Sequence, residues 1–149
     1  MGTITRSACI ALLAAVPCVT STAQTAPQLS AGLQPEDVKW SASPVPGVET
    51  AVLSGDLQQQ GLYLLRVRLA KDSKLQPHTH PDVRYTTVLS GEMYFGFGEA
   101  FDTAKMKRFP AGAIIAIPAN TPHYVWAPNG AVVVQDAGMG PTATSPLKK

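Results

Sequence analysis

Residues 77–98 read PHTHPDVRYTTVLSGEMYFGFG, and this stretch carries the strongest structural signal in the chain. Residues 84–89 and 93–97 are rich in β-branched and aromatic side chains, and a Ser-Gly-Glu turn signal separates them. Along residues 93–98, Met and Phe alternate with Tyr and Gly, which is the period of a strand with two different faces. The stretch therefore predicts two short strands joined by a turn.

The same pattern continues on both sides of this stretch. Runs rich in Val, Ile, Leu, Tyr and Phe are separated by turn-forming segments with Gly, Pro, Asn, Asp or Ser. The further predicted strands are residues 49–54, 62–70, 75–80, 106–109, 113–117, 123–126 and 132–136. No stretch has a sustained helical period, although residues 98–107 leave room for one helical turn. Many short strands with regular turns predict an all-β sandwich, jelly roll or small barrel.

Length and composition define what surrounds this β domain. A chain of 149 residues is close to one domain, and a net charge of +2 with scattered Lys and Arg excludes an electrostatic nucleic-acid footprint. We divide the chain into a signal peptide at residues 1–23, a linker or N-terminal arm at 24–48, a barrel at 49–137 and a flexible tail at 138–149.

The signal peptide is predicted from the order of its parts. A basic residue, Arg6, precedes an apolar run at residues 8–19, and small residues stand before Gln24. Both cysteines lie in this segment, so the mature chain has no thiol ligand and no disulfide. A periplasmic or secreted protein is expected, with no membrane insertion after cleavage because no other apolar run approaches spanning length.

The chain has three histidines, and they lie in two places. His78 and His80 are two apart at the end of one predicted strand, so they project to the same face. His123 begins another predicted strand, from which a third imidazole could complete a facial set of metal ligands. A His-x-His pair alone is a weak signal, and the alternative is that these are surface or hydrogen-bonded histidines.

The residues around the histidines resemble the two sequence motifs of the cupin superfamily. The matching positions are His78, His80 and Gly91 in the first motif and Gly112, Pro118 and His123 in the second. The departures are Asp72 and Asn120 at glycine positions, Arg84 at the glutamate position and Ala127 at the asparagine position. The stretch 77–98 is also similar to small, often exported, single-domain cupins of the cupin 2 type. The resemblance implies a cupin-type jelly-roll β-barrel.

The resemblance also implies a metal site. Residue by residue, it assigns His78, His80 and His123 as ligands of one divalent metal ion and leaves no carboxylate among them. Three-histidine cupins occur among iron-dependent cleaving dioxygenases, so iron is the first expectation, with Zn, Mn, Ni or Cu as alternatives. Loss of the glutamate also fits a degenerate site, and Asp82 is another candidate ligand if its turn directs it inward.

Arg84 is the candidate contact for substrate. Its spacing from the histidines points it into the barrel, where a second cation beside the metal favours a carboxylate, enolate or phenolate. The alternative is that Arg84 pairs with Asp82 or another acid at the barrel rim. Alternation with Arg84 places Thr86 and Val88 inward and Tyr85 on the opposite face.

Three functions follow as hypotheses. The leading one is a metal-dependent oxidoreductase of dioxygenase type acting on a small, oxygen-rich, anionic organic compound. The alternatives are a cupin isomerase or lyase and a non-catalytic periplasmic module that binds a metal or small ligand. Such barrels often pair through their outer sheet or exchange an N-terminal strand, here around residues 38–41, so a homodimer is also expected.

Overall fold

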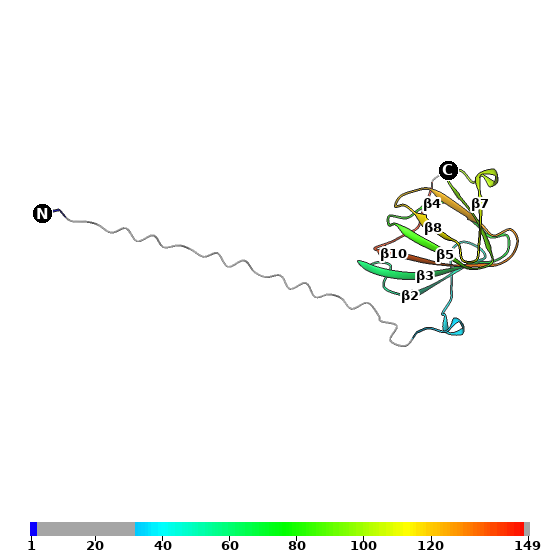
Figure 1. The fold of residues 1–149 in the computed structure, drawn as a ribbon, viewed down its shortest axis with the longest axis horizontal. Helices are drawn as coiled ribbons and strands as arrows, with labels where there is room; N and C mark the ends of the chain where they lie inside the picture. The colour runs from blue at the N-terminus through cyan, green and yellow to red at the C-terminus, as the bar shows by residue number, and fades with distance from the viewer. Residues whose placement is uncertain (3–31, 148–149) are drawn as a thin grey trace.

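The computed structural model describes residues 1–2 and 32–147, and its ordered body is two antiparallel sheets packed face to face (Figure 1). The six-stranded sheet has the order β1-β2-β3-β10-β5-β8, and the five-stranded sheet has the order β11-β4-β9-β6-β7. The elements are η1 (Pro35–Asp37), β1 (Ser41–Ala42), β2 (Val48–Ser54), β3 (Gly61–Leu69), β4 (Lys74–Thr79), β5 (Arg84–Ser90), β6 (Glu92–Phe97), η2 (Thr103–Lys105), β7 (Lys107–Pro110), β8 (Ile114–Ile117), β9 (His123–Trp126), β10 (Val132–Gly140) and β11 (Ser145–Pro146).

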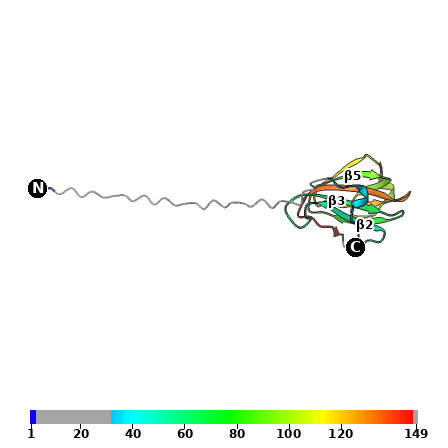
Figure 2. The same ribbon diagram turned by 90° about the horizontal axis from the view of Figure 1, so that it is seen from below.

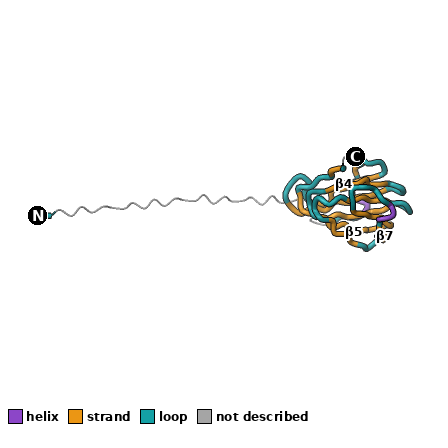
Figure 3. The backbone as a smooth tube through the Cα atoms, turned by 90° about the horizontal axis from the view of Figure 1, so that it is seen from above, coloured by secondary structure: helices purple, strands orange, loops and turns teal. Residues whose placement is uncertain are grey.

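This architecture confirms the predicted all-β jelly roll. Strands β2 to β9 each begin and end within one residue of their predicted bounds. The described residues contain two single 3₁₀ turns and no α-helix, so nearly all of the tube in Figure 3 is strand or loop. The helical turn expected within residues 98–107 is η2. Its start is capped by Asp102, whose side-chain carboxylate accepts a hydrogen bond from the N–H of Ala104 at 2.9 Å. None of the described helices has the length and apolarity that a membrane crossing requires.

The N-terminal predictions are tested only in part. The predicted signal peptide lies outside the described residues, apart from Met1 and Gly2. Within the predicted linker or arm, β1 lies at the edge of the six-stranded sheet and pairs with β2, with Ser41 opposite Thr50. Figure 2 shows β2, β3 and β5 of this sheet from a second side. In this structure the short N-terminal strand is thus paired within its own chain.

The C-terminal end corrects a prediction. Residues 138–149 were expected to form a flexible tail, but β10 continues to Gly140 and pairs with β3 along its whole length. Beyond it, β11 pairs with β4 in the other sheet. Glycines at 138 and 140 hid the strand in the sequence pattern. A Cβ at Gly138 would lie 2.4 Å from the Tyr63 hydroxyl, so this glycine allows close packing rather than flexibility.

The interior between the sheets is divided into an apolar end and a polar end. Along β10, the inward-facing residues Val132 and Val134 are followed by Asp136. In the antiparallel strand β5, the inward-facing residues Arg84 and Thr86 lie at the polar end and Val88 lies at the apolar end. The apolar end holds the core cluster of Val48, Leu69, Val88, Met93, Phe95, Ile115, Ile117, Val125, Ala127, Val132 and Val134. The fold therefore gathers buried polar groups at one end of an otherwise apolar barrel.

Two turns, one at each end of the barrel, keep the backbone of the cupin motifs without its glycines. Asp72 (φ 66°) and Asn120 (φ 56°) are the two non-glycine residues with positive φ in the described part of the chain. Asp and Asn enter the left-handed region more readily than other side chains, so they can replace glycine there. The N–H of Asn120 donates to the His80 carbonyl oxygen at 2.7 Å, which joins this turn to the histidine loop.

Candidate metal centre

The three histidines converge inside the barrel, as their spacing predicts. His78 on β4 is directly opposite His123 on β9, and His80 follows β4 by one residue. Each offers a ring nitrogen that lies within 4.8 Å of those of the other two. Their exposed fractions are 6%, 5% and 2% for residues 78, 80 and 123, so the alternative of surface histidines is excluded.

Hydrogen bonds fix which nitrogen of each ring is available. The Nδ1 atoms of His78, His80 and His123 lie 2.7, 2.8 and 2.9 Å from backbone carbonyl oxygens. A carbonyl oxygen only accepts, so each Nδ1 carries the hydrogen and donates it. In a neutral ring this leaves the lone pair on Nε2. An imidazole whose other N–H is held by a carbonyl is the usual arrangement of a metal-ligating histidine.

The environment keeps all three rings neutral. Burial is the main cause that lowers the pKa of His80 to about 3 and of His123 to about 4, and it also lowers the pKa of His78. The positive charge of Arg84 acts in the same direction on all three rings. Deprotonated imidazoles are the form that binds metal, so the site is ready for a cation near neutral pH.

The donor set fits a divalent transition metal. Three imidazole nitrogens suit Zn, Fe, Cu or Ni, whereas Mg and Ca prefer oxygen ligands. Among the described residues the cluster contains no carboxylate. His78, His80 and His123 would therefore hold the ion through three neutral ligands. Its remaining coordination positions would be left for oxygen atoms of water or substrate.

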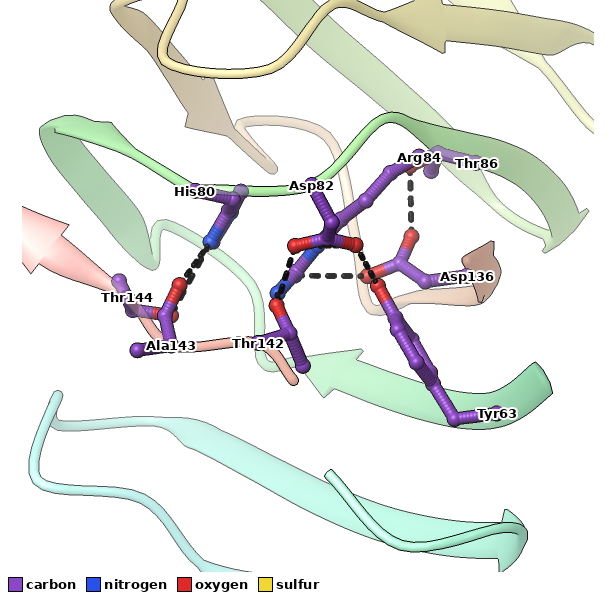
Figure 4. Close-up of polar contacts among 9 residues, drawn as sticks. All are labelled: Tyr63, His80, Asp82, Arg84, Thr86, Asp136, Thr142, Ala143 and Thr144. Carbon is purple, nitrogen blue, oxygen red and sulfur yellow. Dashed lines mark hydrogen bonds and ion pairs between the residues drawn. The ribbon is translucent and has the colours of Figure 1, made fainter. Parts of the chain in front are cut away.

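Arg84 lies inside the barrel and is paired with two carboxylates of its own chain (Figure 4). Its Nε is 3.5 Å from Asp82 Oδ2, and its Nη1 is 3.6 Å from Asp136 Oδ2. Arg84 is only 5% exposed. Arg84 therefore points into the barrel and also pairs with Asp82, so the two alternatives expected for it occur together. Pairing takes place in the interior, where an unpaired charge would be costly.

Hydroxyl groups complete this arrangement, which we call the Arg84 network: Tyr63, Asp82, Arg84, Thr86, Asp136 and Thr142. Tyr63 donates to Asp82 Oδ2 at 2.5 Å, and Thr86 donates to Asp136 Oδ1 at 2.5 Å. Thr142 donates to Asp82 Oδ1 and accepts from Arg84 Nη2 at 2.6 Å. Within the described residues, Arg84 Nε has no hydrogen-bond partner.

Burial changes the acid–base behaviour of two members. Loss of water raises the pKa of Asp136, against the opposing effects of the Thr86 hydroxyl and the Arg84 charge. Burial and the hydrogen bond to Asp82 raise the pKa of Tyr63. Asp82 is bound by Tyr63, Arg84 and Thr142, so it is not part of the histidine cluster that it was expected to join if its turn faced inward.

Sequence reasoning missed three members of the network for different reasons. Asp136 continues the inward alternation of Val132 and Val134, so the two-residue period of the strand could have predicted that Asp136 faces the interior. Tyr63 stood on the alternating face of β3 but had no visible partner in the sequence. Thr142 lies in the segment expected to be a flexible tail, and no local pattern points to it.

The aromatic residues follow strand parity. Tyr85 is 56% exposed on the outer face, as predicted, whereas Thr86 and Val88 are buried. Tyr124 points away from the cavity, packs near Phe101 and donates to the Asp102 carbonyl oxygen at 3.1 Å.

A cavity of about 660 Å³ adjoins the histidines and the Arg84 network. Its polar lining includes the three histidines, Arg84, Thr86, Asp136 and Thr142. Most of its remaining wall is aliphatic, and segments before β2 and after β10 also contribute to the lining. A small molecule in this cavity would meet polar groups at one end and apolar walls elsewhere.

Arg84→Met should destabilise the protein strongly, because it leaves Asp82 and Asp136 buried without their cation. Removal of one partner from a buried pair costs about 3–5 kcal/mol in the free energy of unfolding. Arg68→Met is the matched control, since its pair with Glu49 is about 40% exposed and should contribute about 0–1 kcal/mol. Urea unfolding at neutral pH measures both, and equal losses would contradict the buried pairing.

Acid should destabilise the chelator-treated protein through the histidines. Their pKa values are lowered by folding, so between about pH 6.5 and 4 the unfolded chain binds protons that the folded chain does not. Each histidine then lowers the free energy of unfolding by at most about 1.4 kcal/mol per pH unit as pH falls. The raised pKa of Asp136 has the opposite effect on the pH dependence of the free energy of unfolding. Wild type is therefore compared with His123→Gln, which keeps Asp136 and lacks one histidine. The wild type should have the steeper slope, and parallel slopes would contradict this.

Comparison with known proteins agrees with this fold. The family model of the ChrR cupin-like domain matches residues 29–133. A search of curated proteins finds no match. The polyketide cyclase RemF from Streptomyces resistomycificus has a similar structure, with a TM-score of 0.66 and 18% identity over 80% of this chain and 86% of that chain.

Two further structures show the range of proteins that share this fold. A cupin-2 domain protein from Rhodospirillum rubrum has a TM-score of 0.63 and 16% identity, covering 80% of this chain and 81% of that chain. Salicylate 1,2-dioxygenase from Pseudoaminobacter salicylatoxidans has a TM-score of 0.59 and 13% identity, covering 73% of this chain and 31% of that chain. These likenesses show a common fold, and the sequence match over most of the chain shows that this protein belongs to the ChrR cupin-like family.

Proposed function

We propose that this protein holds one divalent metal ion on His78, His80 and His123 and uses it to oxidise a small, oxygen-rich, anionic organic compound. The observation that carries the proposal is the matched orientation of the three rings. Each Nδ1 donates to a backbone carbonyl, and one ring nitrogen of each histidine lies within 4.8 Å of those of the other two. Three buried, neutral imidazoles held in this way are suited to binding a metal.

Iron is the metal we propose first, with Zn, Mn, Ni and Cu as alternatives that the same donors accept. When bound, it would hold oxygen atoms of the substrate and supply the electron exchange with O₂ that dioxygenase chemistry requires. A dioxygenase places both atoms of O₂ in its product, so the overall reaction needs no further reductant. The cavity beside the histidines provides the space for substrate.

The charges around the histidines favour an anionic ligand. Three neutral ligands leave the charge of a divalent ion uncompensated, and the nearby carboxylates of Asp82 and Asp136 face Arg84. Arg84 lines the cavity, where its positive charge would attract the anionic group of a substrate. We therefore retain Arg84 as the proposed contact for the anionic group, while Asp82 and Asp136 hold its side chain in place.

The chain offers a specific test of the metal site. It contains only three histidines, so untagged protein has no other imidazole to bind the ion. Wild type purified from cells should hold about one metal ion per chain by elemental analysis. His123→Gln should bind Co²⁺ more weakly by more than the roughly 10–100-fold that loss of an outer-shell partner costs. Lys107→Gln, a change at an exposed position outside the cavity lining, is the control and should bind normally.

Consumption of O₂ separates the functional hypotheses. Bound iron with O₂ uptake on a panel of catechols, diketones and hydroxy acids supports a dioxygenase. Substrate conversion without O₂ uptake supports the isomerase or lyase alternative. Bound metal or ligand without conversion supports a binding module. Wild type without metal, and without a change in Co²⁺ binding in His123→Gln, would overturn the metal site.

We also propose that the protein is exported to the periplasm or secreted. The proposal rests on the basic start, apolar run and small residues of positions 1–23. Cell fractionation should recover a chain that begins at Gln24, as read by mass spectrometry of the intact protein. A full-length chain in the cytoplasmic fraction would contradict the proposal.

A further inference from the structure

The three histidine rings are not anchored in the same way. Nδ1 of His78 donates to the carbonyl of Gln76, and Nδ1 of His123 donates to that of Thr121, each only two residues earlier in the chain. Nδ1 of His80 donates to the carbonyl of Ala143, which is 63 residues away. Two rings are therefore held by backbone close to them in the chain, and the third depends on residues beyond β10.

The segment that holds His80 comprises residues 141–147, and we call it the C-terminal strap. It crosses from one sheet to the other, because β10 ends at Gly140 in the six-stranded sheet and β11 pairs with β4 in the five-stranded sheet. Ser145 lies opposite Thr79 and Pro146 opposite His78, and the N–H of Leu147 donates to the Pro77 carbonyl at 3.1 Å. The strap thus pairs with the strand that carries His78 and leads to His80.

Thr142 fastens the strap to the interior. Its side chain is buried, with the residue 5% exposed, and its hydroxyl joins Asp82 and Arg84 (Figure 4). Its backbone N–H donates to the Leu57 carbonyl at 2.7 Å. Asp82 is only two residues after His80, so the contact that fixes Thr142 also fixes the loop that bears the histidine. On the other side of this loop, the His80 carbonyl accepts from Asn120 N–H.

We propose that the C-terminal strap is a positioning element that directs Nε2 of His80 toward the other two rings, with Thr142 as its main attachment. This inference rests on the proposed function for its metal-binding consequence, but it also concerns the metal-free protein. The strap lies beyond residues 29–133, the part matched by the family model. Without it, the Nδ1–H of His80 loses its acceptor and the ring is free to adopt other orientations and tautomers.

The first experiment measures tautomers in metal-free, ¹⁵N-histidine-labelled protein by two-bond ¹H–¹⁵N NMR. Wild type should show all three rings with hydrogen on Nδ1. Deletion of residues 141–149 should convert His80 to a mixture of tautomers while His78 and His123 keep theirs, because their acceptors are local. Deletion of residues 148–149 alone is the control and should match wild type.

The second experiment uses point variants, so that it does not depend on the deletion folding. Thr142→Val keeps the shape of the side chain and removes the hydroxyl, whereas Thr142→Ser keeps the hydroxyl and should restore wild-type behaviour. Thr87→Val makes the same chemical change on the outer side of β5 and is the control. Thr142→Val should shift the His80 tautomer and raise the Kd for Co²⁺ by about tenfold, at the low end of losses at outer-shell partners.

The outcomes separate the two proposals. An unchanged His80 tautomer together with a Co²⁺ Kd within twofold of wild type, in both Thr142→Val and the deletion, would overturn the strap. Equal tautomer changes at all three histidines would also overturn it, because they would show general loosening of the barrel. If His80 alone responds but wild type binds neither Co²⁺ nor Zn²⁺, the positioning role stands and the proposed function fails.

Discussion

The burial of Arg84 is the constraint on which the polar half of this barrel depends. A guanidinium that is 5% exposed needs opposing charge and hydrogen-bond partners, since its hydration is lost. Its partners come from the loop before β5, from β10 and from the strap after β10, and Tyr63 on β3 joins through Asp82. Even Gly138 serves this arrangement, because a side chain there would displace the Tyr63 hydroxyl and Asp82. One buried cation thus connects three strands with the C-terminal end.

This network also defines the character of the metal centre. The cupin motif has a glutamate where this chain has Arg84, and the carboxylates that the structure supplies instead, Asp82 and Asp136, face the arginine rather than the histidines. The rings therefore form a neutral set whose proton affinity is lowered by burial and by the positive charge of Arg84. Such a set would hold a divalent ion without cancelling its charge, and the proposed ligand in the adjoining cavity is therefore an anionic oxygen compound.

Membership of the ChrR cupin-like family accounts for the fold. The fold does not specify the reaction, which depends on the residues of the site. A polyketide cyclase and a salicylate dioxygenase share this architecture with the protein at 18% and 13% identity, so similar barrels carry different chemistry. The site of this chain combines three carbonyl-anchored histidines with a buried arginine and two aspartates. The measurements that bear on the function are therefore the identity of any bound metal, the consumption of O₂ and the orientation of the His80 ring.

The sequence by itself determined strands β2 to β9, the inward direction of Arg84 and the shared face of His78 and His80, because alternation and turn residues act over a few neighbouring positions. It also indicated left-handed turns at Asn120, where a side chain replaces the motif glycine. Only the tertiary structure decided that Arg84 also binds Asp136 and Thr142, that residues 138–140 and 145–146 lie in strands, and that Ala143 holds His80. These contacts join residues 50 or more positions apart, such as Thr86 with Asp136 and Arg84 with Thr142, and no local pattern in one chain specifies such pairs.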